Sequence, residues 1–295
     1  VVSPIDMPPF RQSAMDGYAL NLGDTNTYEI IAEIKAGDTS LPQLNKGQAA
    51  RIFTGAAVPH SANAIAIQEH VTAENTMLTL EKEVVIGANI RGQGEQVKKG
   101  QVALAAGSAI NPAAIGFLAS LGISKVAVHT KPSVAIVTTG NELIPAGTPL
   151  KHGEIYESNA LMLESAMRRC NYTNVSTFKV KDNFENTVSL IRDLKKKYDF
   201  IIITGGISVG DYDFVGKALE ELEVTPLFYK VKQKPGKPLY FGKTQKNFIF
   251  ALPGNPAASL SCFYNYVLPG LEIASGNTDF SLPRIRARST SNYQK

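Results

Sequence analysis

Hydrophobic and polar positions change their spacing near residue 130, and this change divides the chain into two parts. Up to about residue 96, short apolar runs are separated by Gly, Asn and Pro, and few helical periods occur. Such a pattern predicts a β-rich domain of short strands. The predicted strands cover residues 28–34, 49–53, 64–68 and 77–80.

From residue 132 onward, apolar runs alternate with segments of helical period. Strands that alternate with helices in this way indicate βαβ units, so the predicted fold class is α/β with a doubly wound, mostly parallel sheet. Helices are predicted at 159–170, 184–197, 257–274 and from Phe214 onward, and strands at 134–138, 175–180, 200–204, 228–231, 239–241 and 248–252.

A compact helix is predicted between the two parts, over residues 111–122, because Pro suits the first helical position and Gly the end. We therefore expect a linking domain from residues 1–18 and 97–125, a β-rich domain from 19–96, and an α/β domain from 126–275. Residues 276–295 are predicted to begin a C-terminal β domain. Because the chain starts without Met, we expect it to be part of a longer protein.

Composition restricts the function classes. The formal net charge of +4 permits an anionic ligand, but no stripe of basic residues interleaved with aromatics indicates nucleic acid. The basic run at 195–197 ends a helical pattern, where cations complement the helix dipole. No run is apolar enough to span a membrane and no signal-peptide pattern occurs, so we expect neither a membrane nor a nucleic-acid partner.

The cysteines and histidines give little indication of metal or redox chemistry. Cys170 and Cys262 lack a CxxC spacing and are expected to be buried free thiols in a reducing compartment, which favours a cytoplasmic location. The four histidines are scattered, which argues against a zinc site.

The most informative segment follows the apolar run at 200–204. Gly205 and Gly206 open a loop that contains Ser208, Asp211 and Asp213 and leads into a helix. A strand, a glycine loop and a helix place this loop at the carboxyl edge of an open sheet, where ligands bind. Glycines allow close approach of the backbone, and the helix start offers N–H donors to an anion. Neighbouring carboxylates indicate a phosphate held with a divalent cation.

Two later segments add to this prediction. Lys234-Pro-Gly-Lys-Pro238 places two ammonium groups on a stiff turn, and Leu252-Pro-Gly-Asn-Pro256 connects another apolar run to a helix. All three loops are polar and punctuated by Gly or Pro. We therefore expect them to converge at one edge of the sheet.

Six segments together resemble the molybdopterin molybdotransferase family, which includes the E domain of gephyrin. They occur in the family's order and cover nearly the whole chain. The segments are Ser13-Ala-Met-Asp-Gly-Tyr-Ala19, Arg51-Ile-Phe-Thr-Gly-Ala56, Thr138-Thr-Gly-Asn-Glu-Leu143, Gly205-Gly-Ile-Ser-Val-Gly-Asp211, Lys234-Pro-Gly-Lys-Pro238 and Leu252-Pro-Gly-Asn-Pro256.

The resemblance implies an enzyme that inserts molybdenum from molybdate into adenylylated molybdopterin and releases AMP, with Mg²⁺ or another divalent cation. It also implies a homodimer whose composite active sites join the α/β domain of one chain to the β-rich domain of the other. A molybdopterin adenylyltransferase and cofactor-accepting apoenzymes are the further partners that it implies.

By the same resemblance, Asp16, Asp213, Lys234 and Lys237 are predicted to be catalytic, with Asp16 and Asp213 on the metal. The predicted substrate-binding residues are Thr54, Glu142, Gly205, Gly206, Ser208, Pro253 and Pro256.

Simpler roles remain open from the residues alone. Asp211 or Asp213 can cap the following helix, and Ser208 can be a turn hydroxyl. The two lysines can be surface residues on a Pro turn. Asp16, Thr54 and Glu142 can be turn residues, and Pro253 and Pro256 can simply shape their loop.

One position departs from the family pattern. Gln96 stands where the family usually has an acid, and Glu95 points to the opposite face of an extended segment. Two other functions remain open: a molybdopterin adenylyltransferase-like activity and a non-enzymatic scaffold of the gephyrin type. The first of these is normally found without a β-rich part such as residues 1–96.

Overall fold

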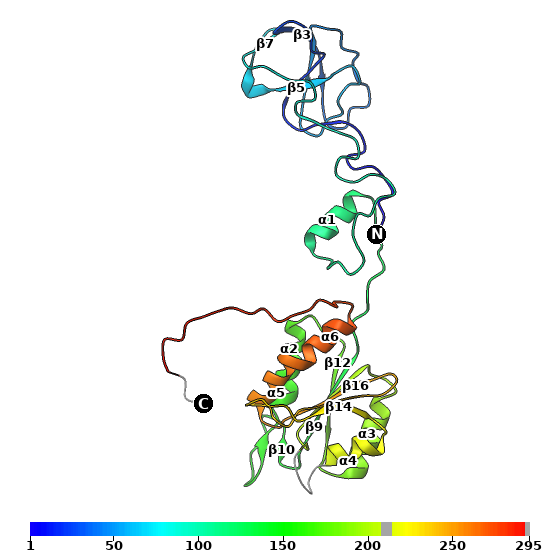
Figure 1. Ribbon diagram of the computed structural model, residues 1–295, viewed down its shortest axis with the longest axis vertical. Coiled ribbons are helices and arrows are strands. Elements are labelled where there is room, and N and C mark those ends of the chain that lie inside the picture. Colours follow the sequence, from blue (N-terminus) through cyan, green and yellow to red (C-terminus); the bar gives the residue numbers. More distant parts are fainter. Residues whose placement is uncertain (208–213, 293–295) are drawn as a thin grey trace. The chain divides into compact units, whose positions relative to one another are not determined.

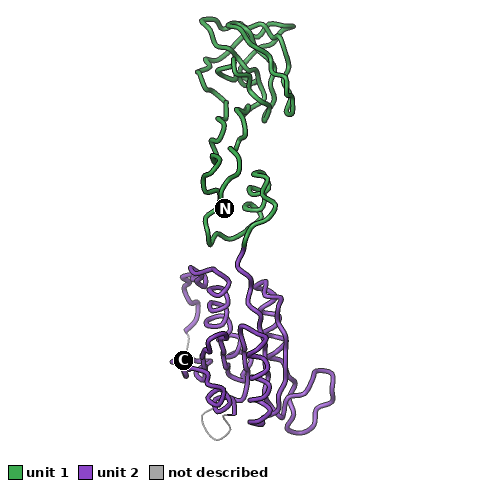
Figure 2. Tube along the Cα trace, turned by 90° about the vertical axis from the view of Figure 1, so that its right-hand side faces the viewer, with its two compact units in different colours: residues 1–127 green, residues 128–295 purple. Residues whose placement is uncertain are grey.

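The computed structural model describes residues 1–207 and 214–292. The chain forms two compact units, Val1–Ala127 and Val128–Lys295, which Figure 2 distinguishes by colour. No helix in the described residues is long and apolar enough to cross a membrane.

The first unit contains a six-stranded sheet in the order β5-β2-β4-β3-β7-β6, within the described residues. Strands β3 and β4 are parallel, and the other neighbours in the sheet are antiparallel. Small and branched residues such as Ala19, Ile52 and Ile65 form a buried cluster on one face, and Leu20, Ala49 and Ala66 belong to a second cluster on the other. The strands are β2 (Gly17–Leu20), β3 (Thr27–Ile34), β4 (Gln48–Ile52), β5 (Ala64–Ile67), β6 (Val71–Glu74) and β7 (Met77–Leu80), with the 3-10 turn η1 (Gln68–His70) after β5.

Two short elements and one helix complete this unit. Strands β1 (Gln12–Ser13) and β8 (Ile90–Arg91) form a separate antiparallel pair. Bridges from Val2 to Val102 and from Met7 to Val97 join the start of the chain to the segment after β8. Helix α1 (Pro112–Ser120) begins as predicted, because the Asn111 side chain accepts a hydrogen bond of 2.8 Å from the Ala114 N–H.

The second unit contains a six-stranded sheet in the order β12-β9-β13-β16-β15-β14, again counted over the described residues. The first four strands are parallel, and β15 and β14 extend the sheet in antiparallel fashion. The strands are β9 (Val134–Thr139), β12 (Val175–Val180), β13 (Phe200–Thr204), β14 (Thr225–Tyr229), β15 (Tyr240–Lys243) and β16 (Phe248–Leu252), and a two-stranded parallel pair, β10 (Leu143–Ile144) and β11 (Ile155–Tyr156), stands apart from them.

Helices cover both faces of this sheet (Figure 1). The alternation of side chains along β9 and β13 explains the two layers. Val134 and Ile202 pack into the cluster of α2, α5 and α6, whereas Ala135 and Ile203 pack into the cluster of α3 and α4. The helices are α2 (Asn159–Arg169), α3 (Phe184–Leu194), α4 (Phe214–Glu221), α5 (Pro256–Cys262) and α6 (Leu268–Ala274), with the π-helical turn η2 (Phe263–Val267) between the last two.

The predicted fold class is therefore confirmed: a doubly wound α/β unit accompanies a β-rich unit. Several strands differ from their predicted extents or were not predicted. Strand β2 begins inside the Ser13–Ala19 motif and ends one residue beyond it, and β10 and β11 are only two residues long each. Residues 277–292 form neither helix nor strand.

Candidate active site

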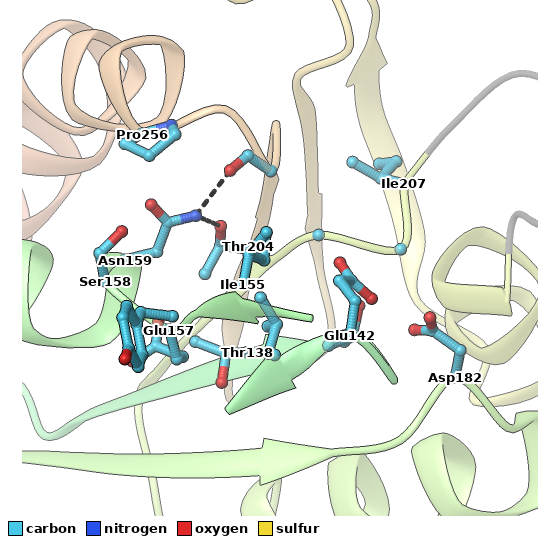
Figure 3. Close-up of a pocket in the computed structure, with 16 residues that line it drawn as sticks. Thr138, Glu142, Ile155, Glu157, Ser158, Asn159, Asp182, Thr204, Ile207 and Pro256 are labelled. Carbon is cyan, nitrogen blue, oxygen red and sulfur yellow. Dashed lines mark hydrogen bonds between the residues drawn. The ribbon is translucent and has the colours of Figure 1, made fainter. Parts of the chain in front are cut away.

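A cavity of about 360 Å³ lies at the carboxyl edge of the parallel strands of the second unit (Figure 3). Its walls come from the ends of β9 and β13, from the loops after β9, β12, β13 and β16, and from the start of α2. Loops at this edge of an open α/β sheet are the usual site of ligand binding. The cavity is therefore the candidate active site.

Two left-handed glycines, Gly205 and Gly206, line the cavity with φ angles of +87° and +62°. Both lie directly against Thr139. A Cβ on Gly205 would lie 2.5 Å from the Thr139 carbonyl oxygen, and a Cβ on Gly206 would lie 2.5 Å from Thr139 Oγ1. Only glycine fits at these positions, so the chain presents bare backbone to the cavity here. Contact of this backbone with substrate remains a prediction.

Asn159 connects three segments around the cavity. Its Nδ2 donates hydrogen bonds of 2.8 Å to Thr204 Oγ1, at the end of β13, and of 2.8 Å to the carbonyl of Gly254, after β16. Figure 3 shows both bonds. A carbonyl oxygen only accepts, so the amide nitrogen must face Gly254. Asn159 Oδ1 and Thr139 Oγ1 are buried without a hydrogen-bond partner in the described part of the chain.

Three carboxylates line the same cavity: Glu142, Glu157 and Asp182. Asp182 follows β12 and exchanges hydrogen bonds with Asn141, at 3.4 Å to the Asn141 N–H and 3.3 Å from its own N–H to Asn141 Oδ1. Glu157 accepts a hydrogen bond of 2.8 Å from the Ala160 N–H at the start of α2. The cavity thus offers carboxylate oxygens as possible metal ligands, and no Lys or Arg is among the described residues that line it.

These oxygens suit a hard cation such as Mg²⁺, which takes one or two carboxylates and completes its shell with water and substrate phosphates. Among the described residues, no group of three or more His, Cys, Asp or Glu side chains is arranged to hold a metal by itself. The carboxylates of the cavity therefore fit a cation that takes its other ligands from elsewhere.

The loop between β16 and α5 closes another side of the cavity. Pro253 is buried and its carbonyl accepts a hydrogen bond of 3.3 Å from Thr204 Oγ1. Pro256 lines the cavity and begins α5, whose first turn is capped by Asn255. Both prolines thus shape the loop, and substrate contact by Pro253 and Pro256 is a prediction.

The lysine turn, residues 230–239, connects β14 to β15. Its position follows from the strand register. Tyr240 pairs with Ala251, near the carboxyl end of β16, and with Tyr229 at the end of β14. The turn between those residues therefore extends beyond the edge of the sheet at which the cavity lies. Lys234 and Lys237 are exposed on this turn and are not part of the cavity wall.

Asp16 and Thr54 lie together in the first unit. Asp16 Oδ1 accepts hydrogen bonds of 2.8 Å from the Thr54 N–H and 2.8 Å from the Thr54 hydroxyl. These bonds, with a smaller contribution from the Arg51 charge, lower the pKa of the Asp16 carboxyl. Arg51 itself is held over the rings of Tyr18 and Phe53, at 5.1 Å and 4.9 Å from their centroids.

Gln96, at the position where an acid was expected, is exposed, and its backbone N–H donates to the Met7 carbonyl at 2.9 Å. The neighbouring Glu95 is already engaged, because its Oε2 accepts a hydrogen bond of 2.7 Å from the Gly92 N–H. Glu95 therefore stabilises its own turn and would have to give up this bond to replace the expected acid.

Three predicted residues, Ser208, Asp211 and Asp213, lie outside the described residues. Other residues of the cavity were not singled out from the sequence: Asp182, Glu157, Asn159 and Thr139. A usable signal existed for Asp182, because it is a polar residue just after a predicted strand that neighbours the first strand of the sheet.

Both parts of the chain match family models. Residues 1–122 match the MoeA N-terminal region (domain I and II), and residues 135–272 match a probable molybdopterin binding domain. Molybdopterin molybdenumtransferase of Haemophilus influenzae is 34% identical over 300 residues, which cover 100% of this chain and 74% of that protein. The Staphylococcus epidermidis protein of the same name is 34% identical over 285 residues, covering 94% and 68%.

A comparison with solved structures also finds a protein of molybdopterin biosynthesis. The crystal structure of the molybdopterin biosynthesis moeA protein from Pyrococcus horikoshii OT3 matches with a TM-score of 0.78 and 29% identity, over 95% of this chain and 71% of that one. A MoeA-type N-terminal region joined to a molybdopterin-binding α/β unit defines a protein of molybdenum cofactor biosynthesis. The chain belongs to the molybdopterin molybdenumtransferase family, and the prediction of a transferase of this family is confirmed.

Proposed function

We propose that this protein inserts molybdenum from molybdate into adenylylated molybdopterin, with release of AMP. The proposal rests on one observation. The glycine pair Gly205–Gly206, the lysine turn and the loop from Pro253 to Pro256 all lie at the carboxyl edge of one sheet. Bare backbone, two cations and an acid-lined cavity therefore occur together at this edge.

Lys234 and Lys237 bind the molybdate oxyanion in this proposal. Within the described residues neither ammonium group has a hydrogen-bond or ion-pair partner, so both are available to a ligand. Compact, strongly hydrated ammonium groups suit an oxyanion, and the exposed turn lets molybdate enter from solvent.

The adenylylated pterin occupies the cavity in this proposal, with its phosphates toward Gly205 and Gly206. Glu142, Asp182 and Asp213 would hold the divalent cation, together with Asp16 of the partner subunit. When bound, the cation neutralises charge on the phosphate oxygens. Without a cation, phosphates would be repelled by the carboxylates that line the cavity.

The reaction then breaks the phosphoanhydride bond between molybdopterin and AMP. A water oxygen bonds to phosphorus and its proton passes to solvent, and the leaving phosphate oxygen keeps the electron pair of the broken bond. Asp16 orients the water or the cation, because its lowered pKa keeps it ionised and Thr54 fixes its position. Assembly as a homodimer would supply Asp16 and Thr54 to the α/β unit of the other protomer.

The test is to incubate the full-length protein with adenylylated molybdopterin, Mg²⁺ and molybdate, and to measure AMP release by chromatography. We expect AMP release that requires molybdate and stops when EDTA removes the cation. Absence of AMP under all these conditions would refute the proposal. A parallel incubation with ATP and molybdopterin tests the adenylyltransferase alternative, for which pyrophosphate would be the product.

A further inference from the structure

The lysine turn is held by more contacts than its exposure suggests. The Lys237 carbonyl accepts hydrogen bonds of 3.0 Å from both the Val231 and the Leu239 N–H. These bonds hold the two ends of the turn together. They do not hold its tip, from Gln233 to Gly236, which needs further hydrogen-bonding groups. The side-chain amide of Gln233 supplies such groups.

The amide of Gln233 joins the tip of the turn to the helical layer. Its Nε2 donates a hydrogen bond of 2.8 Å to the carbonyl of Pro235, and its Oε1 accepts one of 2.8 Å from the Tyr266 hydroxyl. The Pro235 carbonyl can only accept, which fixes the orientation of the amide. Tyr266 is half-buried in the π-helical turn η2, and its ring packs against Phe228 at 6.1 Å.

A second contact lies directly below the tip. A Cβ on Gly236 would lie 2.7 Å from Cys262 Sγ and 2.8 Å from Gln233 Nε2, so the backbone of the turn rests on these two groups. Cys262 is fully buried, and burial raises the pKa of its thiol to about 11. The thiol therefore stays protonated near neutral pH, and its Sγ donates a hydrogen bond of 3.8 Å to the Gly236 carbonyl.

From these contacts we infer that Gln233, through its hydrogen bond with Tyr266, is a positioning residue that holds Lys234 and Lys237 in the arrangement that binds the oxyanion. The inference rests on the proposed function of the two lysines. An ammonium pair on a loose turn would have to be ordered during binding, and the lost freedom would reduce affinity. Gln233 and Tyr266 remove that cost without touching the anion.

The experiment measures the affinity of the purified protein for molybdate by isothermal titration calorimetry. Gln233→Met keeps the length of the side chain without its hydrogen bonds, and Tyr266→Phe removes only a hydroxyl. We expect each change to weaken molybdate binding by about threefold to tenfold, the range of one net hydrogen bond. The double variant should lose little more than Gln233→Met alone, because that change already removes the bond to Tyr266 as well as the bond to Pro235.

Tyr264→Phe is the matched control. Tyr264 lies in the same π-helical turn, but in the described part of the chain its hydroxyl has no hydrogen-bond partner. Its removal should leave molybdate affinity unchanged. Affinity for adenylylated molybdopterin, measured with the same variants, should also stay unchanged, which a general loss of structure would not allow.

Wild-type molybdate affinity in both Gln233→Met and Tyr266→Phe would overturn the inference, and so would equal losses in the Tyr264→Phe control. Lys237→Ala, titrated in parallel, separates the two levels of the argument. If Lys237→Ala binds molybdate normally, the proposed role of the lysines fails. If Lys237→Ala binds weakly while Gln233→Met binds normally, only the positioning role of Gln233 fails.

Discussion

Replacing Thr139 by valine should make the protein more stable. Thr139 ends β9, is 4% exposed, and its Oγ1 has no hydrogen-bond partner in the described residues. Leaving a buried polar group unsatisfied costs about 1–3 kcal/mol. Valine has nearly the same shape and no polar atom, so Thr139→Val removes this cost while filling the same space.

Crowding reduces the expected gain. The hydroxyl lies directly below Gly206, and a methyl group in its place is slightly larger than the oxygen. We therefore expect the lower end of the range, a free energy of unfolding raised by about 1 kcal/mol. For a domain of 150–250 residues, this corresponds to a rise in Tm of about 2–4 °C.

Two controls make the measurement specific. Thr204, one strand away, is 1% exposed, but its Oγ1 accepts from Asn159 at 2.8 Å and donates to Pro253 at 3.3 Å. Thr204→Val should therefore lower stability by about 1–3 kcal/mol. Thr139→Ser keeps the hydroxyl and loses a buried methyl group, which should cost about 1 kcal/mol.

Urea unfolding monitored by circular dichroism gives the free energies of all three variants. Thr139→Val should be the one that unfolds at higher urea concentration than the wild type. If Thr139→Val is instead destabilised as strongly as Thr204→Val, the Thr139 hydroxyl has a partner in solution and the reasoning is refuted.

Further predictions concern the predicted catalytic groups. Lys237→Ala should weaken molybdate binding by about tenfold or more with an unchanged Tm, since the residue is exposed. If calorimetry gives the variant and the wild type the same molybdate affinity, Lys237 does not bind the oxyanion. Mixing Asp16→Ala and Lys237→Ala chains should restore one intact composite site per mixed dimer, so AMP release no higher than in either parent would contradict the cross-chain assignment. The Thr54 hydrogen bonds lower the pKa of Asp16, so the stability they give is present above the carboxyl's usual pKa and is lost as the pH falls through the lowered value; Thr54→Val should make this acid limb shallower in urea titrations without removing it, because the larger contribution comes from the backbone N–H that valine keeps. Gln96→Asp should raise AMP release by up to about a hundredfold, and an unchanged rate would show that this position is not catalytic here.

The elements that follow from local pattern were predicted closely. The apolar runs of β9, β13 and β16 are buried on both faces, as parallel strands covered by helices must be, and their continuous hydrophobicity is visible in the sequence. The predicted helix at 257–274 is also present, although a π-helical turn interrupts it at Phe263–Val267.

The elements that depend on partners were missed or displaced. Strands β10 and β11 consist of two residues each, and only their pairing with each other defines them. Strand β14 begins earlier than predicted because it is an edge strand, where Pro226 is tolerated within the strand. Neither the β10–β11 pairing nor the edge position of β14 can be predicted from the local sequence pattern.

The same division applies to the site. Gly205, Gly206 and the two lysines were visible because Gly and Pro mark loops by themselves. Asn159 was not, since its importance lies in hydrogen bonds to Thr204 and Gly254, residues 45 and 95 positions away. Its place at the start of α2 gives the spacing of an ordinary helix residue.

The mixed sheet explains why cations and carboxylates can share one edge. In a parallel βαβ unit, each loop at the carboxyl edge leads into a helix, whose first N–H groups serve as donors for an anion. The β14–β15 connection is an antiparallel turn at the same edge, so it has no helix start to offer. The exposed Lys234 and Lys237 supply cations there instead, and a turn that carries them is more ordered when groups outside it hold it in place. The link from Gln233 to Tyr266 reaches the helical layer and supplies such an anchor. The antiparallel extension thus adds a cationic turn at the same edge as the acid-lined cavity. The lysines of the turn are not part of the cavity wall.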